Sequence, residues 1–251
     1  MARVLLAWEW GGNSGHIVRL ASIADQLLAR GHQVDIVLQR PDGLRQARHL
    51  VDRVTLRQAP LWPGQLLWGG QLTLPLASTY GDILANFGLS DSGTLEFLLR
   101  AWDQVFADAR PDVVVADFAP AATLAAQGRI PTIVVGTGYT VPPAHLEAFP
   151  VFHPDRDRPN ISEPQLLAVA NRALERLKRP PLPCLPAIAI ADRSHPAVFA
   201  ELDPYASHRL ARPLPPFLSG TPMPAGGGDA LFAYLPFGDM RDQAEQDVAA
   251  G

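Results

Sequence analysis

The chain has 251 residues, of which 47% are hydrophobic, and a net charge of −4, which indicates a globular protein of one large or two smaller domains. Its 21 Lys and Arg residues are scattered and so offer no basic field for nucleic acid, while the single cysteine excludes an internal disulfide. No apolar run reaches the roughly 20 residues of a membrane helix, and no signal-peptide core precedes Glu9, so we expect a cytoplasmic protein without a transmembrane segment.

The first 60 residues alternate short apolar runs with helical patterns. Strands are predicted at residues 3–10, 32–39 and about 53–60, and helices at 16–31 and 42–50. Because neighbouring parallel strands cannot be joined by tight turns, this alternation predicts an α/β fold, in which a parallel sheet carries helices on both faces.

The alternation returns after a looser segment, residues 60–94, in which a helix is expected at about 76–87. The pattern then predicts a helix at 94–109, a strand at 112–118, a helix at 120–128, a strand at 131–136 and a helix at 163–179. The apolar run PDVVVAD ends in Asp117. We therefore expect Asp117 at the carboxyl edge of a central strand, where open α/β sheets bind their ligands.

The last part of the chain is rich in proline. Eleven of the 25 prolines fall between Pro180 and Pro224, with one further strand expected within HPAVFAELDPYASHR. The stretch PMPAGGGD has the composition of an interdomain linker, and the residues after it predict one strand and one helix. We expect a first domain at 1–222, followed at 223–251 by a linker and the beginning of an incomplete second domain.

The glycine-rich turn WEWGGNSGH, at residues 8–16, matches no phosphate-binding motif. Its glycines lack the G-x-G-x-x-G spacing, and the following strand does not end in an acidic residue, which disfavours NAD. The turn has no lysine, which excludes a Walker loop. A nucleophile elbow matches at Gly12, Asn13 and Ser14, but His16 stands where its second glycine belongs. A serine hydrolase based on Ser14 stays an alternative.

The same turn places His16 in the first turn of a helix. The helix dipole disfavours a positive charge there, so a neutral imidazole could accept a proton. A carboxylate that accepts the other ring N–H would orient this base, and Asp117 is the candidate because it ends a strand at the same edge of the sheet. The alternative is that both residues only cap their helices.

The segment GGNSGHIVRLASIADQLLARGHQVDIVL resembles the N-terminal signature of nucleotide-sugar-dependent glycosyltransferases of the GT-B fold, which include UDP-glycosyltransferases of natural products and MurG-type enzymes. PDVVVADFAPAATLAAQGRIPTIVVG is similar to a later strand, helix and strand of that family. FAELDPYASHR, PPFLSGTP and ALFAYLP resemble the stretch around its interdomain linker. The resemblance covers most of the chain and implies the Rossmann-like N-terminal half of a GT-B fold.

The resemblance implies that His16 is the general base that deprotonates an acceptor hydroxyl, and that Asp117 orients it. It further implies inversion at the anomeric carbon, with a nucleotide-sugar such as a UDP-sugar as co-substrate and with neither metal nor cofactor. Gly12, Ser14 and Gly15 would form a loop that contacts the donor. Asp155-Arg156-Asp157 imitates the Asp-x-Asp of metal-dependent transferases, but its flanking arginines and prolines favour a solvated loop.

Several polar and aromatic residues in turns are candidates for binding the acceptor. Aromatic side chains that follow strand ends can line an apolar pocket, although tryptophans beneath a long loop can equally be ordinary packing. The candidates are Trp10, Asn13, Trp62, Trp68 and Tyr139. They predict a small, apolar acceptor.

In GT-B enzymes the nucleotide-sugar is held mainly by the C-terminal domain, and the chain ends before the motifs that the resemblance requires there. We therefore expect an acceptor-binding half-enzyme that is inactive alone. The alternative is a non-catalytic, transferase-like module that binds a hydrophobic small molecule or activates a partner.

Overall fold

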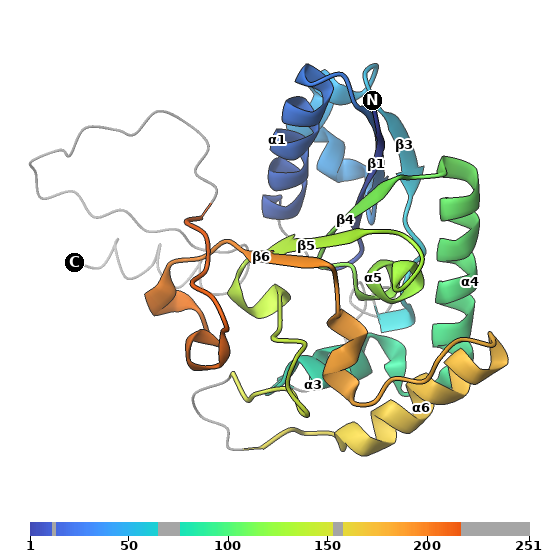
Figure 1. Ribbon diagram of the computed structural model, residues 1–251, viewed down its shortest axis with the longest axis vertical. Helices are drawn as coiled ribbons and strands as arrows, with labels where there is room; N and C mark the ends of the chain where they lie inside the picture. Colours follow the sequence, from blue (N-terminus) through green and yellow to red (C-terminus); the bar gives the residue numbers. More distant parts are fainter. Residues whose placement is uncertain (12–13, 65–75, 153–157, 217–251) are drawn as a thin grey trace, which may run out of the picture. The chain divides into compact units, whose positions relative to one another are not determined.

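The computed structural model describes residues 1–11, 14–64, 76–152 and 158–216 (Figure 1). Its centre is a six-stranded sheet in the order β3-β2-β1-β4-β5-β6, and every neighbouring pair of strands is parallel. The strands are β1 (Arg3–Trp8), β2 (Gln33–Leu38), β3 (Thr55–Gln58), β4 (Val113–Asp117), β5 (Thr132–Gly136) and β6 (Arg193–Pro196). The predicted α/β class and parallel sheet are confirmed.

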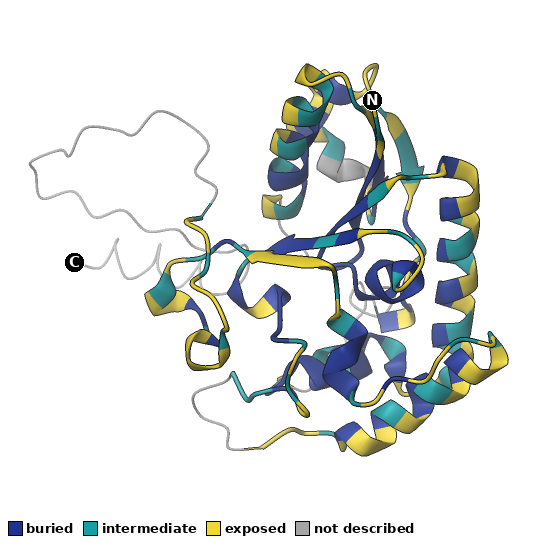
Figure 2. Ribbon diagram, in the orientation of Figure 1, coloured by how far each residue is buried: buried dark blue, intermediate teal, exposed yellow. Residues whose placement is uncertain are grey.

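Helices cover both faces of this sheet. One face packs against α1 (Gly15–Ala29) and the 3-10 helix η1 (Pro41–Leu50). The other face packs against α4 (Ser92–Ala109) and α5 (Pro120–Ala126), and α6 (Glu163–Arg176) packs against α4. Figure 2 shows the central strands buried between these layers. Further short helices are α3 (Tyr80–Leu84), the π-helical turn η2 (Ala85–Leu89) and the 3-10 turns η3 (Gly138–Thr140), η4 (Leu185–Ala189), η5 (Ala200–Leu202) and η6 (Ala206–His208).

The two-residue period of the strands divides the core into two layers. In β1, Leu5 and Ala7 belong to the layer beneath α4 and α5, whereas Leu6 and Trp8 belong to the layer beneath α1. The side chains of these four residues have at most 1% of their surface exposed. Strands buried on both faces are typical of parallel sheets and explain the nearly continuous apolar run in β1.

The helix that was predicted at 76–87 begins later, at Tyr80. Thr79 and Asp82 form a capping box, in which the Thr79 hydroxyl accepts from the Asp82 N–H and the Asp82 carboxylate accepts from the Thr79 N–H. The same carboxylate accepts from the backbone N–H groups of Asn160 and Ile161, which fixes the start of α3 by contacts 78 and 79 residues away. These long-range contacts have no local sequence signal.

Other boundaries also differ from the predictions. A strand was expected within residues 195–209, but β6 covers Arg193–Pro196, and the rest of the expected stretch contains the 3-10 turns η5 and η6 instead. The helix expected at 163–179 ends at Arg176, because Lys178 adopts a left-handed backbone conformation with φ +56°. The linker and second domain predicted at 223–251 lie outside the described residues. Within the described part of the chain, no helix is both long enough and apolar enough to cross a membrane.

Candidate active site

Asp117 ends β4 and faces α1. It pairs in register with Trp8, the last residue of β1. Val115, two residues earlier in β4, lies in the core layer beneath α1. Alternate residues of a strand project to the same face, so the Asp117 side chain also projects toward α1. No part of the Asp117 side chain is exposed. A buried carboxylate requires partners, and α1 supplies them.

His16 and Arg19 of α1 both contact the Asp117 carboxylate. They are three residues apart and therefore lie on one side of the helix. The Nδ1 atom of His16 is 2.9 Å from Asp117 Oδ1, and the Arg19 guanidinium donates to Asp117 Oδ2. The predicted pair of His16 and Asp117 is thus in hydrogen-bond contact, and Arg19 is a third member that the sequence analysis did not identify.

The Asp117 contact decides which ring nitrogen of His16 is available for chemistry. An ionised carboxylate accepts hydrogen bonds but cannot donate them, so His16 Nδ1 carries the proton and donates. The Nε2 atom of the neutral ring is then a proton acceptor. The His16 side chain is 12% exposed, whereas its partner Asp117 is fully buried. The arrangement is that of an oriented general base.

Two aromatic rings pack against the imidazole. The His16 ring centroid is 5.5 Å from that of Trp8 and 5.9 Å from that of Phe118, with interplanar angles of 18° and 23°. Phe118 follows Asp117 directly and has a left-handed backbone conformation, φ +49°, which is unusual for a bulky residue. Its carbonyl accepts from the Trp10 N–H at 3.0 Å. This strained residue is held in place by the contacts that fix the imidazole.

The position of His16 requires glycine at residue 11. The backbone of Gly11 has φ +104°, and a Cβ atom there would overlap the Nε2 and Cδ2 atoms of His16. Any other side chain would therefore meet both backbone strain and a collision with the imidazole. Gly11 allows the turn to pass directly beside the candidate base.

Two of the predicted acceptor-binding residues belong to the core instead. Trp10 and Trp62 have 0% exposed surface, and their rings contact each other edge to face at 4.8 Å. The segment that contains α3, η2 and α4 covers them, with Phe87 stacked on Trp10. These buried rings present no surface to an acceptor, so their predicted role is corrected to core packing.

Tyr139 is the predicted acceptor residue that the structure leaves accessible. It is 42% exposed, and its ring packs edge to face on Phe118 with centroids 5.7 Å apart. Burial and the negative charge of Asp117 raise the pKa of the Tyr139 phenol. Its loop is fixed by Arg209, which donates to the Gly138 carbonyl at 3.0 Å. Tyr139 therefore forms a rigid aromatic rim close to the Asp117 carboxylate.

The remaining predicted residues of the glycine-rich turn and loop are only partly described. Ser14 and Gly15 are exposed at the start of α1, whereas Gly12, Asn13 and Trp68 lie outside the described residues, as do Asp155 and Asp157. In the described ranges, no cluster of three or more His, Cys, Asp or Glu side chains could hold a metal ion.

The backbone at Ser14 does not support the hydrolase alternative. A nucleophile elbow places its serine in a strained conformation. Ser14 instead has ordinary helical angles, φ −68° and ψ −10°, as the N-cap of α1. Among the contacts of the described residues, no hydrogen bond joins its hydroxyl to His16, whose Nδ1 is already bonded to Asp117.

Glu9 is a second buried carboxylate near the end of β1. Burial raises its pKa to about 7, although hydrogen bonds from the Ala121 N–H, the Trp62 indole and the Ala122 N–H counteract the shift. These three donors lie 2.8 to 3.1 Å from its oxygens. Glu9 thus links Trp62 to the beginning of α5. Both of these partners lie in the core layer on the face of the sheet opposite to His16. Its contacts make it a structural anchor rather than a second base.

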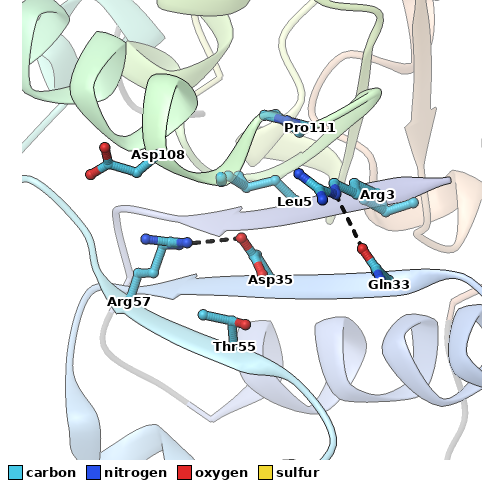
Figure 3. A pocket seen from close by; sticks show the side chains of 10 residues that line it. Arg3, Leu5, Gln33, Asp35, Thr55, Arg57, Asp108 and Pro111 are labelled. Carbon is cyan, nitrogen blue, oxygen red and sulfur yellow. Dashed lines mark hydrogen bonds and ion pairs between the residues drawn. The ribbon is translucent and has the colours of Figure 1, made fainter.

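Two of the cavities that border the sheet lie apart from the candidate base. A polar groove of about 220 Å³ lies at the amino ends of β1, β2 and β3, opposite to the edge that carries Asp117 (Figure 3). In it, Arg57 forms an ion pair with Asp35, and Arg3 donates to the Gln33 side chain. Behind Phe118, a cavity of about 10 Å³ has room for no more than a water molecule. Neither is lined by His16 or Asp117.

Comparisons with known proteins found similarity in structure but not in sequence. No family model and no curated protein matches the chain. Among solved structures, the chain is similar to CalG4, the calicheamicin glycosyltransferase, at 15% identity and a TM-score of 0.53, covering 87% of this chain and 54% of that one. It is similar to the glycosyltransferase of kitacinnamycin at 17% identity and a TM-score of 0.51, covering 82% and 48%.

The glycosyltransferase SnogD from Streptomyces nogalater is 20% identical, with a TM-score of 0.48, and the match covers 94% of this chain and 55% of SnogD. At such identities the first two matches show a shared fold. The chain spans about half the length of these solved structures.

Proposed function

We propose that this chain, which has the fold of GT-B glycosyltransferases, is the acceptor-binding part of an inverting glycosyltransferase. The observation that carries the proposal is the contact between His16 Nδ1 and the buried Asp117 carboxylate at the carboxyl edge of the sheet. That edge is where open α/β sheets bind ligands, and the contact leaves one imidazole nitrogen ready to accept a proton.

The proposed reaction is a direct displacement at the anomeric carbon of a nucleotide-sugar. His16 Nε2 takes the proton of an acceptor hydroxyl while the oxygen of that hydroxyl forms a bond to the anomeric carbon. The bond between this carbon and the diphosphate oxygen of the donor breaks, and the nucleoside diphosphate leaves with the electron pair. Asp117 stabilises the imidazolium that forms. A single displacement inverts the configuration at the anomeric carbon.

The acceptor is proposed to lie on the aromatic rim formed by Tyr139, with Phe118 behind it and Phe152 beside it. The ring of Tyr139 is 5.7 Å from Phe118 and 6.5 Å from Phe152. Planar or apolar molecules gain from stacking on such rings, which favours a small hydrophobic acceptor that carries a hydroxyl group. The nucleotide-sugar is proposed to be held mainly by a second domain, as the half-length match to the solved glycosyltransferases suggests.

Transfer assays on the natural full-length protein test this function. UDP- and dTDP-sugars are incubated with a panel of hydroxylated aromatic and aliphatic acceptors, and products are detected by mass spectrometry. We expect an acceptor mass that increases by one sugar residue, and an inverted anomeric configuration by NMR. Binding of donor and acceptor without transfer would contradict the enzymatic proposal, and a retained configuration would contradict direct displacement.

Replacing Tyr139 by alanine is expected to raise the KM for the acceptor by about two- to tenfold, because an aromatic contact contributes about 0.5–1.5 kcal/mol. The kcat should change less, since the ring contacts of Tyr139 described above are with Phe118 and Phe152 rather than with the His16 imidazole. Steady-state kinetics at saturating donor measure both constants. Tyr139→Phe keeps the ring and should behave like the wild type.

Phe97→Ala serves as the matched control for the loss of an exposed ring. Phe97 is 66% exposed on α4, away from the dyad. An unchanged acceptor KM in Tyr139→Ala, or an equal effect of Phe97→Ala, would remove Tyr139 from the acceptor site.

A further inference from the structure

Arg19 is a cation buried against the sheet. It lies in the second turn of α1, and its side chain is 9% exposed. Burial of a guanidinium is unfavourable unless an opposite charge compensates it. The contact that the structure gives the Arg19 side chain is the one to Asp117, and its Nε atom is buried without a hydrogen-bond partner among the described residues. The position of Arg19 therefore serves the Asp117 carboxylate.

The carboxylate has one partner for each oxygen. Oδ1 accepts from His16 and Oδ2 accepts from Arg19. With both oxygens bonded, the carboxylate has a fixed rotation, which in turn fixes the plane of the imidazole. Burial, together with the negative charge of Asp117, also raises the pKa of the Tyr139 phenol. Glu9 bonds to Ala121 and Trp62, which lie in the opposite core layer.

Arg19 also changes the charge balance around His16. A lone buried carboxylate attracts a proton onto the neighbouring imidazole, because the attraction between unit charges is strong where water is excluded. An imidazole that is already protonated cannot act as a base. The positive charge of Arg19 offsets most of this attraction, so the group of His16, Asp117 and Arg19 is close to neutral when the imidazole is neutral.

We propose that Arg19 is a positioning residue for the transfer reaction: it fixes the Asp117 carboxylate and keeps the His16 imidazole unprotonated at neutral pH. This inference rests on the proposed function. Arg19 touches neither substrate in the proposed geometry, so it acts only through Asp117. Arg19 thus adds a positively charged side chain to the pair of His16 and Asp117.

Removal of the positive charge of Arg19 is expected to shift the acid limb of the pH–rate profile for sugar transfer. In Arg19→Gln, which keeps a donor but no charge, the pH of half-maximal transfer should rise by about one unit, since nearby charges shift proton affinities by about one unit or more. On the acid limb the rate should then fall by up to about tenfold, and on the plateau at high pH it should recover to within about threefold of the wild type. Arg19→Lys keeps the charge and should leave the profile nearly unchanged.

Arg30→Gln is the matched control, because Arg30 caps the same helix and its guanidinium donates to Gln26 at the surface. Its profile should equal that of the wild type. Equal loss of rate at every pH in Arg19→Gln would overturn the charge role and leave a structural one. Dispersion of the amide NMR spectrum shows whether each variant is folded.

A second readout does not depend on transfer. The ¹⁵N shifts of the His16 ring nitrogens report which of them carries a proton, and they can be measured on this chain without substrates. We expect a neutral ring protonated at Nδ1 in the wild type near pH 7.5, and a larger imidazolium fraction in Arg19→Gln. If no acceptor is glycosylated but the ring nitrogens respond as expected, the proposed function fails and with it the role of Arg19 in transfer, while the effect of Arg19 on the protonation of the imidazole stands. Unchanged ring nitrogens would overturn it.

Discussion

Replacing His16 by alanine is expected to lower kcat for sugar transfer by about 100-fold or more, because a positioned general base contributes about 10² to 10⁴. The acceptor hydroxyl would then have to lose its proton to water while it attacks the anomeric carbon. The KM for the acceptor should change little, since the aromatic rim at Tyr139 and Phe118 stays in place. A loss confined to kcat marks an interaction that is made in the transition state.

The chain offers a matched control for this substitution. His49 also pairs with a carboxylate, with 2.8 Å between its Nε2 and Asp25 Oδ2, but this pair lies at the surface, where the His49 side chain is 51% exposed. His49→Ala removes a histidine and a histidine–aspartate contact without touching the sheet edge. It should transfer sugar at the wild-type rate. If His16→Ala stays within a few fold of the wild type, His16 is not the general base.

The contact between His16 and Asp117 could be anticipated from the sequence because two local signals converge on one place. The glycine-rich turn predicts that His16 begins a helix after the first strand, and the apolar run PDVVVAD predicts a strand that ends in Asp117. In a parallel sheet the carboxyl ends of all strands meet at one edge, so residues that are 101 positions apart become neighbours. The parallel arrangement of the strands is therefore enough to predict that His16 and Asp117 are neighbours.

Arg19 and Gly11 were not anticipated, although each had a signal. Arg19 stands among apolar residues on the face of α1 that also carries His16, which is unusual for a basic residue unless a carboxylate faces it. Gly11 belongs to a turn whose glycines fit no phosphate-binding motif, and the partial match to a nucleophile elbow begins at Gly12. Glycine is required at position 11 because a Cβ atom there would collide with the His16 imidazole. This contact depends on the exact path of the turn.

The acceptor side was predicted less well. Trp10 and Trp62 follow strand ends in the sequence, as pocket residues often do, but α3, η2 and α4 cover them. The start of α3 depends on hydrogen bonds from Asn160 and Ile161 to Asp82, about 80 residues away. Burial of an aromatic residue in a turn is therefore decided by tertiary contacts that local patterns do not contain.

Replacing Asp117 by asparagine is expected to lower kcat by about 1000-fold, because the amide can no longer accept a hydrogen bond at both positions. If its NH₂ group faces His16, Nδ1 must accept, the ring proton moves to Nε2, and the base is lost. If its NH₂ group faces Arg19, two donors meet in a buried space. Both orientations also leave Arg19 without an opposite charge, which costs about 3–5 kcal/mol in the free energy of unfolding.

Urea denaturation and steady-state kinetics measure the two effects separately. Asp103→Asn is the control: Asp103 also contacts cations, Arg129 and Arg179, but its side chain is 35% exposed, so its loss should cost little stability and no activity. The pH dependence of kcat then distinguishes a loss of imidazole orientation from a change in imidazole charge. Raising the pH should restore Arg19→Gln, because its imidazole needs only to lose a proton, but it should not restore Asp117→Asn, whose amide has no ionised form. Transfer by Asp117→Asn within about tenfold of the wild type would show that the imidazole is oriented without Asp117, and the dyad would have to be abandoned.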